Sequence, residues 1–144
     1  MTEKILVGYD GSDAGKRALD YAVDSARERG AELIVAHILE WSPYTFLTPK
    51  ELEERHKRRE EELKRAEEAL LAPVVAAVKK QGVPVETVLR YGHIADTLCK
   101  VAKDAKVRQI VIGRDGSSKL SQRLFGSVAN SVAQASTVPV TIIP

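Results

Sequence analysis

The chain has 144 residues, of which 44% are hydrophobic and 29% charged, and its formal net charge is +2. This length fits one domain with its own core, and the composition excludes a disordered chain. The small net charge disfavours a nucleic-acid partner, and no apolar run approaches the roughly 20 residues that span a bilayer. We therefore expect a single domain over residues 1–144, without a membrane segment. The single cysteine, Cys99, cannot form an internal disulfide, which favours a cytoplasmic location.

The beginning of the chain predicts a strand, a helix and a second strand. Residues Lys4–Tyr9 (KILVGY) form a continuous apolar run that is typical of a central parallel strand. The turn Asp10-Gly11-Ser12 follows, and the side chain of Ser12 or Asp10 is expected to cap a helix that ends at Gly30. Residues Glu32–Leu39 (ELIVAHIL) predict the second strand. We interpret His37 within it as a hydrogen-bonded core residue, because no metal-binding side chain lies near it in the sequence.

A loop rich in aromatic residues separates this unit from a long charged helix. Residues 41–49 (WSPYTFLTP) predict either a lid or a segment that packs its aromatic side chains against the sheet edge or a partner chain. From Thr48, with Glu51 three residues later, a capped helix is predicted to run towards Gly82. Its charged first half predicts a helix that lies on the sheet with most of its surface in water. Pro73 is expected to kink it.

The second half of the chain predicts three more strands. Residues Pro84–Tyr91 alternate between apolar and polar side chains, which predicts an edge strand. A helix with one apolar face follows over His93–Ala105, and Cys99 on it is expected to be a small core residue. Residues Gln109–Ile112 form a β-branched run, as expected for a strand covered on both faces. The fifth predicted strand is Val138–Ile143. The helix before it is expected to turn three residues inward: Val128, Val132 and Ala135.

This alternation of strands and helices predicts a doubly wound α/β domain, a Rossmann-like five-stranded parallel sheet with helices on both faces. Sheets of this kind bind ligands outside the carboxyl ends of their strands, where the winding changes direction. With the strand order 3-2-1-4-5, that point lies between the first and fourth strands. Asp10 and Gly113 follow these two strands, so a carboxylate and a glycine loop are expected to share one crevice.

The glycine loop spans residues 113–127 (GRDGSSKLSQRLFGS). Glycine lets the backbone turn successive N–H groups towards an anion, and Gly113, Gly116 and Gly126 are spaced along the loop. Ser127 opens the next helix, whose positive end favours a phosphate. Each glycine taken alone is also explained by a simple turn. The spacing fits neither a Walker A loop nor the dinucleotide fingerprint, and the arrangement as a whole predicts a phosphate-binding loop.

Three segments together resemble the universal stress protein family: residues 7–12 (VGYDGS), residues 36–38 (AHI) and the pattern Gly113…Gly116…Gly126-Ser127. The likeness covers essentially the whole chain, and its glycine pattern is characteristic of the ATP-binding branch of the family. The resemblance implies a cytoplasmic, ATP-binding regulatory or nucleotide-sensing protein of the stress response. It also implies a homodimer in which the last strands of two subunits pair.

The resemblance further implies a site for ATP, or for AMP or ADP. Gly8 and Ile38 would contact the adenine, and Asp10 would face the ribose or the phosphates. A divalent ion, Mg²⁺ or Mn²⁺, is expected with the triphosphate, with Asp10 or Ser127 as candidate protein ligands besides the phosphate oxygens. The complete set of implied cofactor-binding residues is Gly8, Tyr9, Asp10, Ile38, Ile112, Gly113, Gly116, Ser117, Gly126, Ser127 and Val128.

Asp115 departs from the family, which often has a histidine or a basic residue at this position. A carboxylate about 4 Å from a phosphate oxygen would cost about 4 kcal/mol at an effective dielectric constant near 20. We therefore expect Asp115 to point to solvent or to the metal. Positive charge would come from Arg114, Lys119 or Arg123. The alternative is a weak nucleotide site.

The sequence predicts no catalytic residue, because no side chain has an identifiable orienting partner. Two alternatives to nucleotide sensing remain at this point. One is a slow ATPase or phosphotransferase, in which Asp10 or His93 activates water. The other is an interaction module independent of nucleotide, in which the charged helix or the loop around Trp41 docks a partner.

Overall fold

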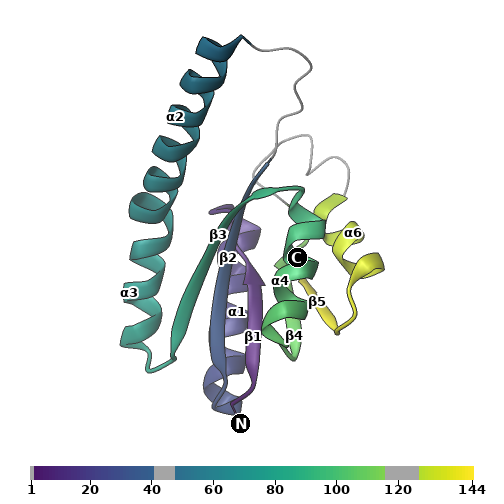
Figure 1. The fold of residues 1–144 in the computed structure, drawn as a ribbon. Helices are drawn as coiled ribbons and strands as arrows, with labels where there is room; N and C mark the ends of the chain where they lie inside the picture. Colours follow the sequence, from purple (N-terminus) through teal and green to yellow (C-terminus); the bar gives the residue numbers. More distant parts are fainter. Residues whose placement is uncertain (1, 41–47, 116–126) are drawn as a thin grey trace.

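The computed structural model describes residues 2–40, 48–115 and 127–144, and these residues contain one five-stranded parallel sheet. Its strands lie in the order β3-β2-β1-β4-β5 (Figure 1), which confirms the predicted order. β1 pairs with β2 on one side and with β4 on the other, so the winding changes direction between β1 and β4. The strands are β1 (Lys4–Gly8), β2 (Glu32–Glu40), β3 (Val85–Gly92), β4 (Gln109–Gly113) and β5 (Val140–Ile143).

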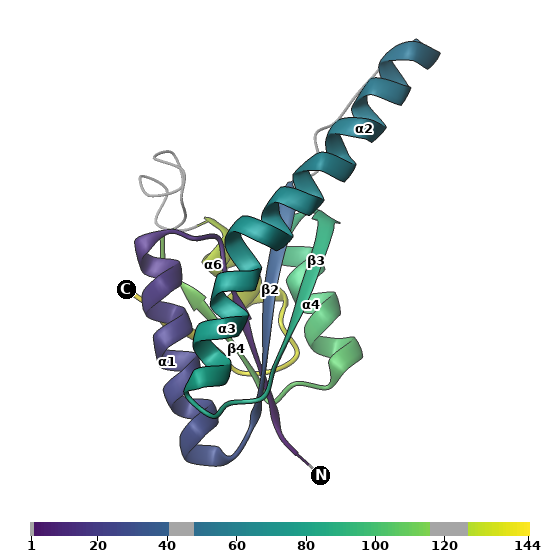
Figure 2. The same ribbon diagram turned by 90° about the vertical axis from the view of Figure 1, so that its left-hand side faces the viewer.

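Helices cover both faces of the sheet, as Figure 2 shows. The first and third helices, α1 and α3, pack on one face, and α4 and α6 pack on the other. The helical elements are α1 (Asp13–Arg29), α2 (Pro49–Arg65), the π-helical turn η1 (Ala66–Leu71), α3 (Ala72–Lys80), α4 (Ile94–Ala105) and α6 (Ser127–Ala135). Among these described helices, none is long and apolar enough to cross a membrane.

The continuous apolar run of β1 reflects its central place in the sheet. Ile5 and Val7 belong to the core beneath α1 and α3, whereas Leu6 belongs to the core beneath α4 and α6. All three side chains are 0% exposed. A strand covered on both faces needs apolar residues on both sides, and the three central residues of β1 supply them. β3, which alternates, lies at the edge of the sheet, as predicted.

Side-chain caps fix the starts of α1 and α2. The Oγ atom of Ser12 accepts a hydrogen bond from the backbone N–H of Gly15 at 3.0 Å. The Oγ1 atom of Thr48 accepts one from the N–H of Glu51 at 3.2 Å. Both bonds satisfy donors that have no partner within the helix, and they confirm the two predicted helix starts.

The long helix continues through Pro73 by changing its hydrogen-bond pattern. Proline lacks an N–H group, and its ring crowds the carbonyl group four residues earlier. Immediately before Pro73 the helix takes the π-helical turn η1, in which the N–H of Ala72 reaches the carbonyl oxygen of Glu67, five residues back. α3 then continues with Pro73 in its first turn. The predicted disturbance at Pro73 is therefore a widened turn within one long helix.

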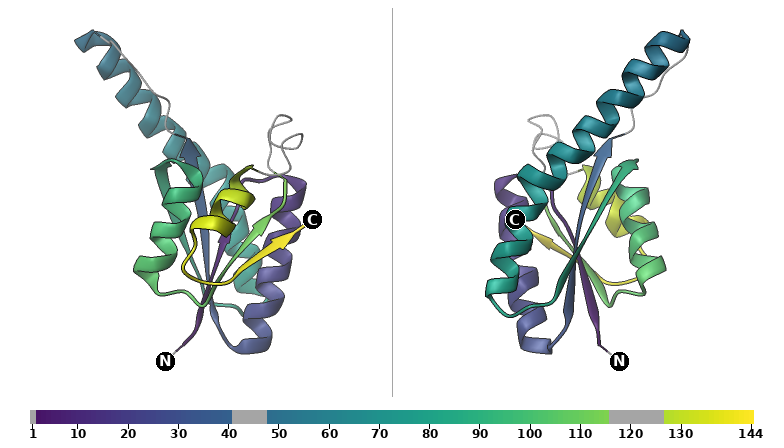
Figure 3. Two further views of the ribbon diagram at one scale, coloured as in Figure 1. Left: turned by 90° about the vertical axis from the view of Figure 1, so that its right-hand side faces the viewer. Right: turned by 60° about the vertical axis from the view of Figure 1, so that its left-hand side comes forward.

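Two sequence-based expectations need correction. α2 does not lie on the sheet along its whole length: none of its residues is buried, and Figure 3 shows it extending past the carboxyl ends of the strands. Even Leu52, an apolar residue near the start of α2, is 52% exposed. Ala135, expected to face inward, is exposed, because it occupies the last position of α6.

The loop around Trp41 lies outside the described residues, and both of its interpretations stay predictions.

Candidate functional site

A pocket opens at the carboxyl ends of β1 and β4, where the predicted crevice lies. Residues from the ends of β1, β2 and β4, from the first turns of α1 and α4, and from the start of α6 line it. It encloses about 560 Å³ of empty space, including the part that is open to solvent. Sheets of this kind bind ligands at this point, so the pocket lies where a ligand site is expected.

One wall of the pocket is apolar. Gly8 contributes no side chain, and a Cβ atom at this position would lie 3.1 Å from Cδ1 of Leu98 and 3.6 Å from Cδ1 of Ile112. The absence of that atom leaves room for a flat group against the strand end. The aliphatic residues of this wall are Ile38, Ile94, Leu98, Ile112 and Val128. Such a wall suits an aromatic ring, which packs its faces against aliphatic side chains.

The opposite part of the pocket holds a carboxylate at the start of α1. The Oδ1 atom of Asp10 accepts hydrogen bonds from the N–H of Ser12 at 3.0 Å and from its hydroxyl group at 2.5 Å. Gly15 makes this approach possible, because a Cβ atom on it would lie 2.6 Å from Oδ1 of Asp10. A negative group is favoured at a helix N-terminus, so the turn holds Asp10 in place beside the pocket.

Among the described residues that follow β4, a cation and a further carboxylate lie at the pocket. Arg114 and Asp115 both line the pocket, and Nε of Arg114 lies 4.0 Å from Oδ2 of Asp115. The Asp115 side chain is 30% exposed. It therefore lies on the pocket wall beside a guanidinium group, rather than fully in solvent. The N–H of Arg114 donates to the carbonyl oxygen of Ile143 at 2.7 Å, which fixes the direction of the chain after β4.

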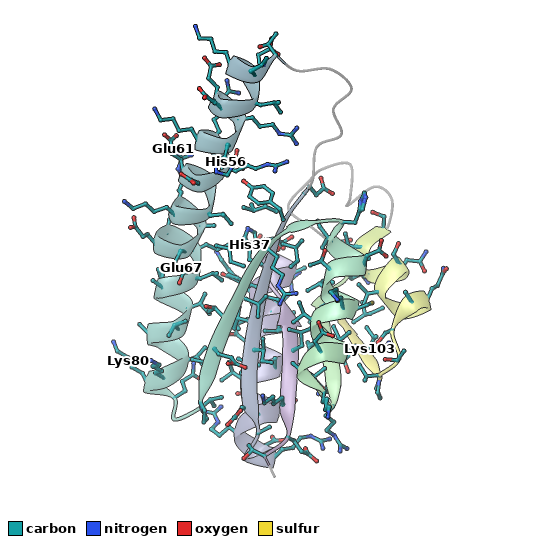
Figure 4. All side chains as sticks on the ribbon, viewed as in Figure 1. His37, His56, Glu61, Glu67, Lys80 and Lys103 are labelled. Carbon is teal, nitrogen blue, oxygen red and sulfur yellow. The ribbon has the colours of Figure 1, made fainter. Side chains whose placement is uncertain are left out.

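Tyr9 and His37 fix the position of the strand ends. The Nδ1 atom of His37 lies 2.8 Å from the carbonyl oxygen of Tyr9, so this nitrogen carries the proton and donates. The hydrogen bond predicted for His37, which Figure 4 labels, is therefore present, but the side chain is only partly buried and lines the pocket instead of lying in the core. Burial, followed by the charges of Asp10 and Asp20, raises the pKa of the Tyr9 hydroxyl group, which keeps it protonated near neutral pH.

The structure brings most of the predicted site residues together. Seven of them line the pocket: Gly8, Tyr9, Asp10, Ile38, Ile112, Gly113 and Val128. Ser127 begins α6, as predicted, next to the lining residue Val128. Gly116, Ser117 and Gly126, together with Lys119 and Arg123, lie outside the described residues. His93, considered as a residue that activates water, precedes α4 and is not among the residues that line the pocket.

Sequence reasoning missed several lining residues, and Ile94 and Leu98 matter most. The sequence placed both on the apolar face of a helix and read them only as core. A helix that follows a parallel strand runs back along the sheet, so its first turns lie beside the carboxyl ends of the strands. The early position of Ile94 and Leu98 in α4 was therefore a usable signal. The other missed lining residues are Gly15, Ala36, His37 and Ala129. Arg114 and Asp115, which the sequence analysis considered beside the phosphates, also line the pocket.

The protein's own side chains do not form a metal cage in the part of the chain that the structure describes. No group of three His, Cys, Asp or Glu residues there is arranged to hold an ion. The pocket does contain hard oxygen donors, namely the carboxylates of Asp10 and Asp115. These donors suit a divalent ion that a phosphate group also binds.

Known proteins resemble this chain along its full length. The model of the universal stress protein family matches residues 1–144. The universal stress protein YxiE of Bacillus subtilis is 34% identical over 156 residues, covering 99% of each chain. The solved structure of universal stress protein UspA from Lactobacillus plantarum superposes with a TM-score of 0.86 at 25% identity, covering 99% of this chain and 97% of the other.

Two further solved structures contain nucleotides. A universal stress protein in complex with cAMP has a TM-score of 0.71 at 27% identity, covering 99% of this chain and 96% of that one. The universal stress protein from Archaeoglobus fulgidus in complex with dAMP has a TM-score of 0.67 at 26% identity, covering 99% and 98%. With the match of the family model over residues 1–144, these similarities show that the chain belongs to the universal stress protein family.

Proposed function

We propose that this protein binds an adenine nucleotide, ATP or an AMP-type mononucleotide, in the pocket between β1 and β4. It would act in the cytoplasm as a regulatory, nucleotide-sensing module of the stress response and not as an efficient catalyst. The observation that carries the proposal is the combination of an aliphatic slot at Gly8 with a polar end at Asp10 in one pocket. A nucleotide has the same two-part chemistry, with a flat apolar base and a hydrophilic ribose phosphate.

The base would occupy the slot against β1. Gly8 leaves the space, and the side chains of Ile38 and Leu98 supply apolar contacts. The ends of β1 and β2 lie at the base edge, where backbone groups can read it by hydrogen bonding. Two relatives of known structure bind cAMP and dAMP, which share the adenine ring. This likeness supports adenine as the base.

The ribose and the phosphates would lie towards Asp10 and the end of β4. Arg114 supplies a positive charge on this side of the pocket, and α6 begins beside it at Ser127. A helix start of this kind favours a phosphate. The predicted phosphate contacts at Gly116, Ser117 and Gly126 belong to the same proposal, as part of the segment between β4 and α6.

A divalent ion, Mg²⁺ or Mn²⁺, would accompany a triphosphate. It would be held mainly by phosphate oxygens, with Asp10 or Ser127 as protein ligand, because carboxylate and hydroxyl oxygens suit these hard ions. When bound, the ion would neutralise part of the phosphate charge. This neutralisation would reduce the repulsion between the phosphates and the two carboxylates of the pocket.

The protein would form a homodimer through its last strand. β5 is an edge strand of the sheet, and Ile142 within it is 40% exposed. Unpaired backbone groups along an edge strand invite pairing with another chain. A second copy would continue the sheet across a two-fold axis. Light scattering that gives the monomer mass at micromolar concentration would contradict this part of the proposal.

Calorimetric titration of ATP, AMP and GTP, each with and without Mg²⁺, tests the proposal. We expect adenine nucleotides to bind at least about tenfold more tightly than GTP, a difference of about 1.4 kcal/mol. Gly8→Val fills the slot and is expected to abolish binding. Ala133→Val, which adds bulk on the exposed side of α6, is the matched control and should bind as the wild type does.

Each outcome of this titration has a distinct meaning. No binding of any nucleotide at millimolar concentration would overturn the proposed function. Unchanged binding by a folded Gly8→Val variant would place the nucleotide elsewhere. If the protein with ATP and Mg²⁺ released phosphate faster than buffer alone, the function would be that of a slow ATPase and not of a nucleotide sensor.

A further inference from the structure

The charged helix α2 projects from the body of the protein. In Figures 1 and 3 its N-terminal half extends beyond the carboxyl ends of the strands. None of its residues is buried. A helix with so little packing needs another source of stability. We call the segment Pro49–Arg65 the arm, and the side of the arm turned away from the sheet its outer face.

Tyr91 ties the lower part of the arm to the sheet. The hydroxyl group of Tyr91, in β3, donates to Oε2 of Glu62 at 2.5 Å. The guanidinium carbon of Arg59 lies 5.3 Å from the centre of the Tyr91 ring, a cation–π distance. Because Arg59 and Glu62 contact the sheet, the side of the helix opposite to them faces solvent. This anchor orients the outer face in a fixed direction.

The outer face has a regular alternation of charge. Acidic pairs stand at 53–54 and 60–61, and basic pairs at 57–58 and 64–65. Successive pairs are three or four residues apart, about one helical turn, so all four lie on one side of the helix. All eight residues are exposed. Figure 4 labels Glu61 on this side of the arm. The outer face therefore has the sign order minus, plus, minus, plus along about 18 Å of helix.

This sign order is complementary to itself when the helix is reversed. Read from the other end, the face has the order plus, minus, plus, minus. A second arm laid antiparallel, with its two-fold axis at the height of Arg59, would place each acidic pair opposite a basic pair. The facing residues would be Glu53 with Arg65, Glu54 with Lys64, Lys57 with Glu61, and Arg58 with Glu60, each occurring twice by symmetry.

We infer that the outer face of the arm is an interaction surface for a second copy of this chain, paired antiparallel through these alternating charges. The surface differs from the β5 edge, because the arm leads into α3 on the β3 side of the sheet, whereas β5 is the opposite edge. The contact contains charged groups at its centre, so it is weak and depends on salt.

The same charge spacing also stabilises a single helix. Oppositely charged residues four residues apart attract each other within one helix, as Lys100 and Asp104 do at 3.7 Å in α4. An experiment must therefore separate attraction between two helices from attraction within one. Two charge-reversed variants separate attraction between helices from attraction within a helix. In the first all four pairs become basic (Glu53→Lys, Glu54→Lys, Glu60→Lys and Glu61→Lys), and in the second all become acidic (Lys57→Glu, Arg58→Glu, Lys64→Glu and Arg65→Glu).

Sedimentation velocity at low ionic strength compares the wild type, each variant alone and an equal mixture of the two. Either variant alone would set like charges opposite each other and should lose the association through the arm. The mixture should associate at least about tenfold more tightly than either variant, because opposite charges face each other again. Raising the salt from about 0.05 M to about 0.5 M should remove this gain, because the screening length shortens. A mixture that behaves as the average of its components would overturn the inference.

Disulfide trapping tests the register and does not depend on the charge-reversed variants folding. In a Cys99→Ser background, a Lys57→Cys protein mixed with a Glu61→Cys protein should give a mixed disulfide dimer under mild oxidation. The control mixture joins Glu54→Cys with Glu61→Cys, which share the outer face but are offset by three residues, about 4.5 Å along the helix. Equal trapping in both mixtures, or none in the first, would overturn the inference.

Discussion

A Cβ atom on Gly113 would lie 2.8 Å from the carbonyl carbon of Ala14 and 3.0 Å from its Cβ atom. The end of β4 therefore lies directly against the first turn of α1. The helix cannot retreat easily, because Ala18, Ala22 and Ala26 along its inner side are 0% exposed. This close approach brings two walls of the pocket together.

Gly113→Ala is therefore expected to lower the free energy of unfolding by about 1–3 kcal/mol, the usual cost of overpacking. The added methyl group meets backbone atoms that have no alternative rotamer. The variant should also bind adenine nucleotides more weakly, since β4 and α1 must move apart. Urea unfolding followed by circular dichroism measures the first effect, and calorimetric titration measures the second.

Gly8→Ala is the matched control for the unfolding measurement. Its added methyl group would meet only the ends of the Leu98 and Ile112 side chains, at 3.1 and 3.6 Å. These ends can move by a few tenths of an ångström, so we expect a loss below about 1 kcal/mol. Equal destabilisation by the two variants would show that the contact between Gly113 and Ala14 is not the constraint described here.

The caps of α1 and α2 should differ in their effect on stability, although their hydrogen bonds are alike. Ser12→Ala removes the acceptor of the Gly15 N–H and a donor to Asp10, and should lower the free energy of unfolding by about 1 kcal/mol. Thr48→Ala removes the corresponding acceptor from a helix without buried residues. It should fray the helix start and change global stability by less than about 0.5 kcal/mol.

Urea unfolding together with amide hydrogen exchange distinguishes these two effects. Thr48→Ala should speed exchange in the first turns of α2 only. Ser12→Ala should speed exchange in α1 and, through the lower global stability, in the central strands. A larger loss in the free energy of unfolding for Thr48→Ala than for Ser12→Ala would mean that the arm contributes more to global stability than its exposure indicates.

The central strands could be predicted because their signals are local, and their order followed from assigning the chain to the doubly wound fold class. β1 has an uninterrupted apolar run from Ile5 to Val7, and this pattern indicates burial on both faces. The capping residues Ser12 and Thr48 also act within three residues of themselves. The family resemblance then pointed to Gly8, Asp10 and Ile38, which the structure brings to one pocket.

The features that the sequence did not reveal depend on contacts between distant segments. The length of α2 beyond the sheet depends on where β2 and β3 end relative to the helix, and no residue within α2 encodes this. Ala135 belongs to the apolar pattern of its helix, yet it lies at the last turn, past the end of the surface it would cover. The π-helical turn before Pro73 depends on both the proline and the packing of Leu71, which is 0% exposed.

Tyr91 should lower stability at high pH, through its contact with the arm. Burial, the hydrogen bond to Glu62 and the charge of Glu62 raise the pKa of Tyr91 from 10.0 to about 12, while Arg59 acts in the opposite direction. Between these two values the folded protein keeps the proton that the unfolded chain releases. The stabilisation from this group is therefore complete below about pH 10 and is lost as the pH rises through about 12.

Tyr91→Phe tests this assignment by titration of the tyrosinate absorbance. The variant should lack the step near pH 12 that the wild type shows, and its unfolding free energy near neutral pH should fall by less than about 1 kcal/mol, because the hydrogen bond is exposed. Tyr21→Phe, at a tyrosine that is 45% exposed, should leave this step in place. A step that persists in Tyr91→Phe would contradict the assignment.

Neutralising Asp115 should strengthen the binding of ATP more than that of AMP. Asp115 lines the pocket next to Arg114. In the proposed complex its carboxylate would act on the phosphates and reduce the attraction of the guanidinium group for them. Two unit charges about 8 Å apart interact by about 2 kcal/mol at an effective dielectric constant near 20, and salt reduces this value. Asp115→Asn should therefore raise the affinity for metal-free ATP by about tenfold.

The gain in affinity from Asp115→Asn should be smaller for AMP, because AMP carries fewer phosphate charges. It should also be smaller in the presence of Mg²⁺, because the ion neutralises part of the triphosphate charge. Asp104→Asn is the matched control. Its carboxylate lies 3.7 Å from Nζ of Lys100 and stands at the end of α4 opposite to the pocket residue Ile94, about 15 Å along the helix. Calorimetric titration of Asp115→Asn and Asp104→Asn with ATP and with AMP measures these changes in affinity. Equal gains for ATP and AMP would mean that the Asp115 carboxylate does not act on the β- and γ-phosphates. A gain in Asp104→Asn as well would mean that the effect is not specific to Asp115.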